Sequence, residues 1–467
     1  MISDFSSVLS ATFGQTIPHP DLTLIRELKR IHPNSQIVAT TEGRDTTFPI
    51  LEYLESINIR AEIVKSDSHA SFEYDSSKEF RKVLPMIIAG ITTFTYVQTN
   101  FHAYKVMWNY AMSMHFFYAF VFEADDDSLG RQLASEVYKW AEKLKEEIWV
   151  YEEGRWAKNE DMFRAIRAAS WDDVVLHPSF KEGIRRDTET FFNSQEIYRS
   201  LGITWKRGIL LLGPPGNGKT ESIKALLNEF PNAALYVKSF STPYGPEYGV
   251  RGIFEKARKH APCILVLEDL DSMVTDEVRS FFLNEMDGLA QNEGILTIAT
   301  SNHPERIDDA ILNRPSRFDV KYDYTLPDFE LRQAFASKWI RKIGGLGSIA
   351  GGGSGVTFTN SSADLVKKLA EKTEGWTFAF LKELFISFLL RIAHDSSLRK
   401  RENCSHIEQH SPDDVLMDQV DKLSAQILHV RKEEEGKDFK PAKVEGLGRW
   451  LPPFLDTPSR GRSAQAF

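Results

Sequence analysis

The residues with the clearest chemical meaning lie at 213–220, where the chain reads GPPGNGKT and matches the pattern G-x-x-x-x-G-K-[ST] in full. A strand-like run comes before this stretch and a helix-forming run follows it. In such a loop, glycines let backbone N–H groups turn toward phosphate oxygens, and the next helix adds partial positive charge at its N-terminus. The pattern predicts a nucleoside triphosphate site, with Lys219 on the β- and γ-phosphates and Thr220 on Mg²⁺. The residues expected around the phosphates are Gly213, Pro214, Pro215, Gly216, Asn217, Gly218, Lys219, Thr220 and Glu221.

Two adjacent carboxylates, Glu268 and Asp269, follow the apolar run 264–267. The carboxyl ends of parallel strands point into the crevice where such sheets bind ligands. One carboxylate can hold the metal and the other can polarise the attacking water. An acidic pair after a strand is often only a helix cap. Behind a matched phosphate loop, the pair predicts catalysis, with Glu268 and Thr220 at the metal and Asp269 or Glu268 at the water.

A third apolar run, 294–299, leads to Asn302, whose amide can donate to and accept from a water near the γ-phosphate. Farther along, Arg314 and Arg317 flank a proline turn and could reach a phosphate. An arginine supplied by a neighbouring subunit stabilises charge in the transition state. The alternative is a pair of surface ion pairs, which contribute little.

The bulk composition is that of an ordinary globular protein, with 42% hydrophobic and 26% charged residues. A net charge of -9 gives no support for a nucleic-acid partner. The two cysteines, Cys263 and Cys404, form no disulfide framework and suit a reducing compartment inside the cell, with the cytoplasm preferred over the mitochondrion or nucleus. The first residues lack a secretory signal. The uncharged stretch 83–104 carries enough polar residues to predict buried strands and no clear transmembrane segment.

The order of expected elements divides the chain into five parts. Residues 1–80 form a small N-terminal region of unknown role, and residues 81–175 form an α+β module with a hairpin at 148–156. Strands and helices alternate over 176–326, which predicts an α/β fold with a parallel sheet and helices on both faces. Residues 327–435 are helical in pattern, apart from a glycine-rich insertion at 344–355, and residues 436–467 resemble a poorly ordered tail.

Taken together, these residues resemble the AAA ATPases from about residue 171 to residue 384. The features that carry the resemblance are Gly202-Ile203, the loop at 213–220, ILVLEDLD at 264–271, LNEMDGL at 283–289, the stretch 300–319 and GWTFAFLKEL at 375–384. The resemblance implies a P-loop NTPase sheet with a small helical lid, ATP and Mg²⁺ as ligands, Gly202 and Ile203 as further nucleotide contacts, and Asn302 as a sensor. It also implies inter-subunit arginines at Arg314 and Arg317, and hence a homo-oligomeric ring.

Three features depart from the common pattern of that family. The acidic pair runs Glu268-Asp269 in place of Asp-Glu, which looks most like the branch of the mitochondrial Rieske-protein translocase, although no N-terminal membrane helix of that branch is legible here. Ser316 stands where many members have glycine, which leaves open which arginine reaches across. The usual aromatic pore loop is replaced by 240–249, in which Tyr244 or Tyr248 could grip a substrate chain or be packed loop aromatics.

The leading functional hypothesis is a ring-forming ATPase that remodels or moves a protein partner. A nucleic-acid motor is less consistent with the acidic net charge, and DNA-stimulated turnover would revive it. A small-molecule kinase would have no use for Asn302 or for the arginine pair. A nucleotide-binding scaffold with little turnover is the remaining alternative, because the exchanged acidic pair could weaken hydrolysis.

Overall fold

The computed structural model describes residues 19–43, 47–73, 82–110, 113–230, 232–288, 292–312, 314, 317–345, 356, 358–359, 362–402 and 411–435. The chain divides into two compact units. One comprises Met1–Ala334 with Thr377–Ala379, and the other comprises Phe335–Trp376 with Phe380–Phe467.

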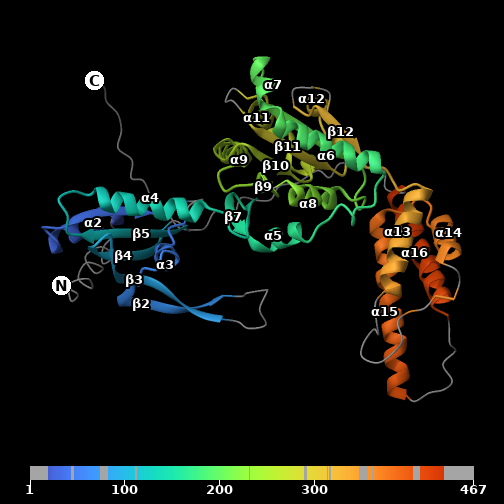
Figure 1. Ribbon diagram of the computed structural model, residues 1–467, viewed down its shortest axis with the longest axis horizontal. Coiled ribbons are helices and arrows are strands. Elements are labelled where there is room, and N and C mark those ends of the chain that lie inside the picture. The colour runs from blue at the N-terminus through green and yellow to red at the C-terminus, as the bar shows by residue number, and fades with distance from the viewer. Residues whose placement is uncertain are drawn as a thin grey trace, which may run out of the picture. The chain divides into compact units, whose positions relative to one another are not determined.

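The first sheet of the larger unit has five strands in the order β1-β5-β4-β3-β2, and each neighbouring pair is antiparallel (Figure 1). The strands are β1 (Gln36–Thr41), β2 (Glu62–Glu73), β3 (Lys82–Tyr96), β4 (Thr99–Tyr110) and β5 (Ser113–Phe122). Helix α2 (Pro20–Ile31) buries Leu24 and Leu28 on one face. Helices α3 (Ile50–Ser56) and α4 (Ser128–Glu142) cover the other face, where Phe101 stacks on Phe122 with ring centroids 4.6 Å apart.

This sheet does not follow the expected division of the chain at residue 80. Strands β1 and β2 come from the expected N-terminal region, and they pair with β5 and β3, respectively, of the expected α+β module. Strand pairing joins segments that are distant in the sequence, so a change in composition at residue 80 marks no structural boundary. The uncharged stretch 83–104 lies in β3 and β4, as the sequence predicts. Among the described helices, none combines the length and the apolar character that a membrane crossing needs.

The second sheet of this unit has seven strands in the order β12-β8-β11-β10-β9-β6-β7. They are β6 (Ile148–Glu152), β7 (Arg155–Asn159), β8 (Lys206–Leu212), β9 (Ala233–Val237), β10 (Cys263–Leu267), β11 (Ile295–Ser301) and β12 (Val320–Asp323). All neighbours run parallel except β6 and β7, which form the predicted hairpin. This hairpin extends the second sheet beside β9, so that sheet begins before the expected boundary at residue 176.

Helices cover both faces of the second sheet, which confirms the predicted α/β fold (Figure 1). Helices α9 (Pro246–His260) and α11 (Asp276–Asp287) pack on one face, and α6 (Pro178–Asn193) and α8 (Lys219–Glu229) pack on the other. Short helices complete the connections: α5 (Glu160–Arg167), α7 (Gln195–Ser200), α10 (Leu270–Met273), α12 (Asp309–Leu312) and a 3₁₀ turn, Pro304–Arg306.

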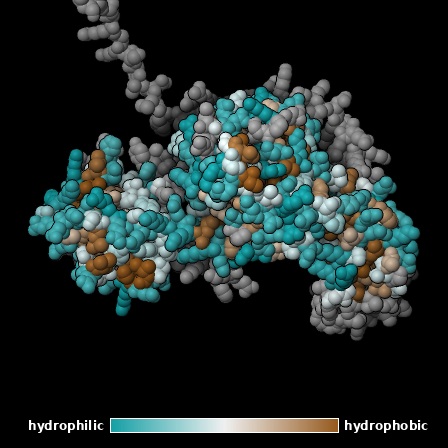
Figure 2. Space-filling view, turned by 45° about the horizontal axis from the view of Figure 1, so that its top comes forward, coloured by the Kyte–Doolittle hydropathy of each residue, from teal (hydrophilic) through white to brown (hydrophobic). Residues whose placement is uncertain are grey.

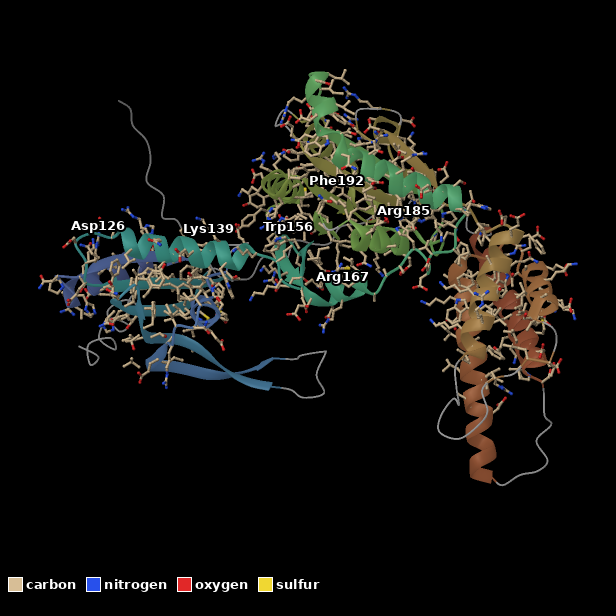
Figure 3. All side chains as sticks on the ribbon, in the orientation of Figure 1. Asp126, Lys139, Trp156, Arg167, Arg185 and Phe192 are labelled. Atoms are coloured by element: carbon tan, nitrogen blue, oxygen red, sulfur yellow. The ribbon has the colours of Figure 1, made fainter. Side chains whose placement is uncertain are left out.

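Two arginines tie neighbouring helices to α8, the helix that follows the phosphate loop (Figure 3). Arg167 of α5 donates to Asn228 Oδ1 at 3.1 Å, and Arg185 of α6 donates from Nε to Glu229 Oε2 at 2.9 Å. The far end of α8 is therefore held from two sides.

The smaller unit is helical. It is formed by α13 (Phe329–Gly344), which begins in the larger unit, α14 (Ser362–Lys372), α15 (Phe378–Glu402) and α16 (Pro412–Glu435). Trp339 stacks on Phe385 with ring centroids 5.5 Å apart. Gly375, at φ +75°, ends the turn that separates α14 from α15. Beyond Gly345, the expected glycine-rich insertion lies outside the described residues, as does the expected tail at 436–467.

Large apolar side chains that remain exposed are spread over several elements, among them Leu22, Val97, Ile197, Leu201 and Leu390. The face seen in Figure 2 accordingly shows separate hydrophobic areas on a mainly hydrophilic surface. Scattered exposure of this kind is ordinary for protein surfaces and marks no particular function.

Candidate functional site

The phosphate loop connects β8 to α8 at the carboxyl edge of the second sheet. Three of its glycines have φ values in the left-handed region: Gly213 at +134°, Gly216 at +79° and Gly218 at +94°. A Cβ atom on Gly213 would lie 2.1 Å from the carbonyl oxygen of Tyr324, so a side chain there would collide with the backbone. The loop conformation therefore requires glycine, and it leaves the backbone N–H groups accessible for anion binding.

Lys219 and Asn217 are the buried polar residues of this loop. The Lys219 ammonium donates to the carbonyl oxygens of Gly213 and Pro214. Burial lowers the pKa of Lys219, and the carboxylates of Asp269, Asp271 and Glu268 oppose that shift. The Asn217 side chain is 1% exposed, and neither its amide nitrogen nor its amide oxygen has a hydrogen-bond partner among the described residues. A loop with a buried cation and an unsatisfied amide is suited to an anionic ligand.

The two adjacent carboxylates have different partners. Glu268 Oε1 accepts a hydrogen bond of 2.6 Å from the Thr220 hydroxyl, and Glu268 Oε2 accepts one from the Tyr236 hydroxyl. Asp269 Oδ1 instead accepts a bond of 2.7 Å from the side-chain amide of Asn302. The structure therefore places Glu268 with the predicted metal-binding threonine and Asp269 with the predicted sensor asparagine.

The backbone at Asp269 offers a reason for the exchanged order of the two acids. Asp269 has φ +54° and ψ +52°, a left-handed conformation that aspartate adopts more readily than most residues. Its N–H donates to the Thr300 hydroxyl at 2.9 Å, which fixes this turn to the end of β11. Burial raises the pKa of Asp269, and the nearby charges of Glu268 and Asp271 add to that effect.

Three residues of this site were not among those expected from the sequence: Tyr236, Thr300 and Asp271. Asp271 Oδ1 accepts from the Ser301 hydroxyl at 2.8 Å and from the Asn302 N–H at 3.2 Å, so it orients the sensor segment. The sequence signal that could have indicated Tyr236 is its hydroxyl, which lies within the otherwise apolar strand β9.

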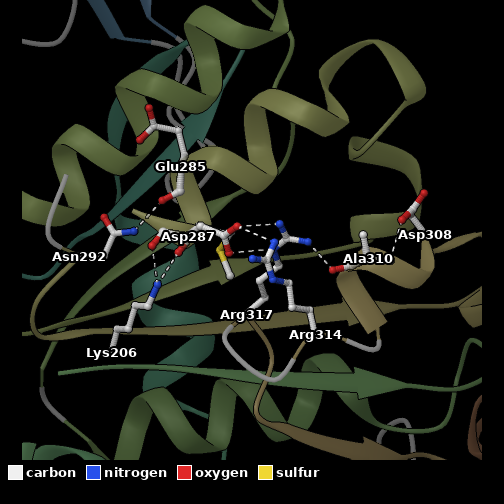
Figure 4. Close-up of polar contacts among 9 residues, drawn as sticks. Lys206, Glu285, Asp287, Asn292, Asp308, Ala310, Arg314 and Arg317 are labelled. Atoms are coloured by element: carbon white, nitrogen blue, oxygen red, sulfur yellow. Dashed lines mark hydrogen bonds and ion pairs between the residues drawn. The ribbon is translucent and has the colours of Figure 1, made fainter. Parts of the chain in front are cut away.

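The two predicted arginines have different environments, although both bond to Asp287 (Figure 4). The Arg317 side chain is 4% exposed. It donates to Asp287 from Nε at 2.9 Å and from Nη2 at 2.7 Å, and its Nη1 donates to the carbonyl oxygen of Ala310. The Arg314 side chain is 59% exposed and makes one contact of 3.2 Å with Asp287. Arg317 is thus an internal anchor of its own domain, and Arg314 is presented to solvent.

Gly202 and Ile203 lie away from the phosphate loop, at the opposite end of β8, so the structure does not bring them beside the residues expected around the phosphates. They come before β8 and the loop comes after it, and the strand's seven residues span about 20 Å. Trp205 accepts a backbone bond from Gly294, which places this segment at the amino ends of the strands. The start of α6 lies at the loop's edge instead, because Phe180 packs on Tyr324, whose carbonyl oxygen lies against Gly213.

Tyr244 and Tyr248 belong to the segment between β9 and the first turn of α9. Their side chains are 73% and 52% exposed, and their ring centroids are 5.5 Å apart. They are therefore surface aromatics that pack on each other and not core residues.

The oxygen donors of Thr220 and Glu268 fit Mg²⁺. A hydroxyl and a carboxylate already lie within hydrogen-bond distance of each other beside the phosphate loop. Among the described residues, no group of three or more His, Cys, Asp or Glu side chains could hold a metal by itself. Mg²⁺ commonly uses one or two protein oxygens together with substrate phosphates, so a small donor set of this kind is appropriate.

Comparisons with known proteins agree with this geometry. Residues 209–326 match the family described as "ATPase family associated with various cellular activities (AAA)". The chain is 28% identical over 264 residues to the ATP-dependent zinc metalloprotease FtsH of Marinobacter nauticus, over 52% of this chain and 38% of that protein. It is 30% identical over 269 residues to the ATP-dependent zinc metalloprotease YME1L of Drosophila melanogaster, over 53% of this chain and 33% of that protein.

A further relative is the cell division cycle protein 48 homolog of Archaeoglobus fulgidus, which is 33% identical over 198 residues, or 39% of this chain and 27% of that protein. The chain thus spans about a third of the length of the curated relatives it matches. The fold, the phosphate loop and these relatives agree with the match of residues 209–326 to the AAA family of ATPases.

Proposed function

We propose that this chain binds ATP with Mg²⁺, hydrolyses it at the contact between subunits of a homo-oligomeric ring, and uses the turnover to remodel or move a protein partner. The observation that carries the proposal is the separation of the two carboxylates. Glu268 is bonded to Thr220 beside the phosphate loop, whereas Asp269 is bonded to Asn302 at the next strand end.

In the proposed reaction, the loop N–H groups and the Lys219 ammonium bind the phosphates. Thr220 and Glu268 would hold Mg²⁺, which when bound neutralises phosphate charge. Asp269 accepts a proton from water while the water oxygen bonds to the γ-phosphorus, and the bond from that phosphorus to the bridging oxygen breaks. Asn302 holds Asp269 and can orient the same water. The raised pKa of Asp269 makes it a stronger base than an ordinary aspartate.

Arg314 is the residue that we assign to a neighbouring subunit's nucleotide. Its exposed guanidinium is available for another subunit, while Arg317 is occupied by Asp287 and Ala310 within its own. An arginine that must act in trans requires an oligomer, and a ring gives every site a neighbour. Two relatives carry printed names that describe ATP-dependent proteases, which is consistent with a protein as the partner of this chain.

The exposed pair Tyr244 and Tyr248 is the candidate contact with that protein partner. The Glu-Asp order supports the finer assignment to the Rieske-protein translocase branch. The low cysteine content favours a reducing compartment inside the cell, such as the cytoplasm, the mitochondrion or the nucleus.

Phosphate release from ATP by the purified chain tests the proposed hydrolysis, with Asp269→Asn as the informative variant. We expect this variant to bind ATP normally and to turn it over at least about a hundredfold more slowly, the scale of a lost general base. Asp276→Asn is the matched control, because that carboxylate is 96% exposed on α11. ATP binding without phosphate release by the natural chain would favour the scaffold alternative, and full turnover by Asp269→Asn would overturn the assignment of the base.

A further inference from the structure

Tyr236 holds one oxygen of the carboxylate that we assign to the metal. It is 2% exposed on the interior strand β9, and its hydroxyl donates to Glu268 Oε2. Glu268 Oε1 is bonded to Thr220, so the two oxygens of this carboxylate have separate donors. The carboxylate plane is therefore fixed from both sides before any ligand binds.

The strand register explains how Tyr236 reaches Glu268. In the parallel pair β9 and β10, Tyr236 lies opposite Val266, and Glu268 follows Val266 by two residues. Side chains two residues apart on extended backbone point to the same face, and diagonal neighbours are within reach of a long side chain. Tyr236 and Val266 both pack in the core beneath α8, the helix whose first turn carries Thr220.

The chemistry of the pair suits a permanent anchor. Glutamate has one more rotatable bond than aspartate, so an unsupported Glu268 would sample more orientations than an aspartate at the same place. A phenol is an O–H donor that can satisfy a carboxylate oxygen without adding charge.

We propose that Tyr236 is a positioning residue for Mg²⁺ binding: its hydroxyl orients the Glu268 carboxylate toward the Thr220 side of the phosphate loop. This inference rests on the proposed function, because it assumes that Glu268 serves the metal of bound ATP. It also explains how a glutamate can stand at this position, since the tyrosine removes the freedom that the extra methylene adds.

The test is the Mn²⁺ affinity of the full chain, measured by electron paramagnetic resonance with the non-hydrolysable analogue AMP-PNP bound. Tyr236→Phe removes only the hydroxyl, and we expect Mn²⁺ binding to weaken at least about tenfold, as is common when a partner of a metal ligand is lost. Tyr322→Phe is the matched control. It removes a hydroxyl that donates to Asp187 at 2.5 Å, in the same sheet but on β12, and should leave Mn²⁺ affinity unchanged.

A second pair of variants separates positioning from a general packing effect. In Glu268→Asp the shorter carboxylate cannot reach both donors, so adding Tyr236→Phe should weaken Mn²⁺ binding by less than about twofold further. Full additivity of the two changes would overturn the inference. So would equal Mn²⁺ affinities for Tyr236→Phe and Tyr322→Phe.

Nucleotide binding without metal distinguishes a wrong role for Tyr236 from a wrong proposed function. Fluorescent ATP binding in EDTA should be the same for the natural chain, Tyr236→Phe and Tyr322→Phe, because Lys219 and the loop N–H groups are untouched. If the natural chain binds neither nucleotide nor Mn²⁺, the proposed function itself is wrong. If it binds both and Tyr236→Phe does so equally well, only the role of Tyr236 is wrong.

Discussion

Arg314 and Arg317 both bond to Asp287, but replacing them should have different effects. Replacing Arg317 should lower stability, whereas replacing Arg314 should lower turnover. Arg317→Ala removes a guanidinium that is 4% exposed and makes two bonds to Asp287 and one to Ala310. Arg314→Ala removes a guanidinium that is 59% exposed and makes one contact of 3.2 Å. The first change should destabilise the ATPase domain, and the second should remove activity from a folded protein.

The magnitudes follow from burial. Breaking a buried ion pair by removing one partner costs about 3–5 kcal/mol, because a charge is left behind without compensation. Asp287 is 31% exposed and keeps Arg314 as a neighbour, so water and Arg314 recover part of this loss. We therefore expect Arg317→Ala to lower the free energy of unfolding by about 3 kcal/mol, the lower end of that range. Arg314→Ala should lower it by less than about 1 kcal/mol, as for other exposed pairs.

Urea unfolding followed by tryptophan fluorescence gives the stabilities, and phosphate release gives the turnover. Arg314→Ala should hydrolyse ATP about a thousandfold more slowly than the natural chain, with an unfolding midpoint close to that of the natural chain. Equal stabilities for the two variants would show that the Arg317 cluster does not anchor the domain. Full turnover by a folded Arg314→Ala protein would show that Arg314 does not act on a neighbour's nucleotide.

Three further predictions concern pH, packing and a thiol. The hydrogen bond from Arg317, and then its positive charge, lower the pKa of Asp287. The stability that this ion pair contributes is therefore complete above the unfolded pKa and is lost as pH falls below about 4. Asp287→Asn should show a shallower loss of stability between pH 6 and pH 3 in acid unfolding, and an unchanged slope would contradict this. Gly130→Ala would bring a Cβ within 2.5 Å of the buried Phe122 ring, so the melting temperature of the N-terminal sheet should fall, whereas a rise would mean that helix propensity outweighs the clash. Burial raises the pKa of the Cys263 thiol to about 12, so mass spectrometry should find Cys263 unalkylated in folded protein at pH 8 and alkylated in urea; labelling without urea would show that the strand opens.

The phosphate loop and the parallel sheet could be predicted because their signals are local. Residues 213–220 carry the whole motif, and β8, β10 and β11 contain the mainly apolar runs that lead to the predicted polar residues. Glu268, Asp269 and Asn302 meet because the carboxyl ends of neighbouring parallel strands meet at one edge.

What the sequence did not reveal depends on pairings between distant segments. The β6–β7 hairpin joins the sheet beside β9 although β9 lies some eighty residues farther along, and the pairing of β1 with β5 crosses the expected boundary at residue 80. Gly202 and Ile203 were expected at the nucleotide from the resemblance to AAA ATPases, and the structure shows that a strand of seven residues separates them from the phosphate loop. Arg314 and Arg317 differ in how deeply their side chains are buried. The sequence shows two arginines close together and does not indicate which of them is buried.

The most direct test of the central claim is the turnover of a mixture of two inactive variants, Asp269→Asn and Arg314→Ala. If ATP is cut by the acids of one subunit with an arginine from the next, some contacts in a mixed ring join an intact Asp269 to an intact Arg314. Random mixing of equal amounts gives about a quarter of such contacts in a closed ring of head-to-tail subunits. The account predicts that phosphate release in the mixture recovers toward a quarter of the natural rate, while each variant alone stays inactive. A mixture no more active than its separate components, in particles that do assemble with ATP, would contradict it.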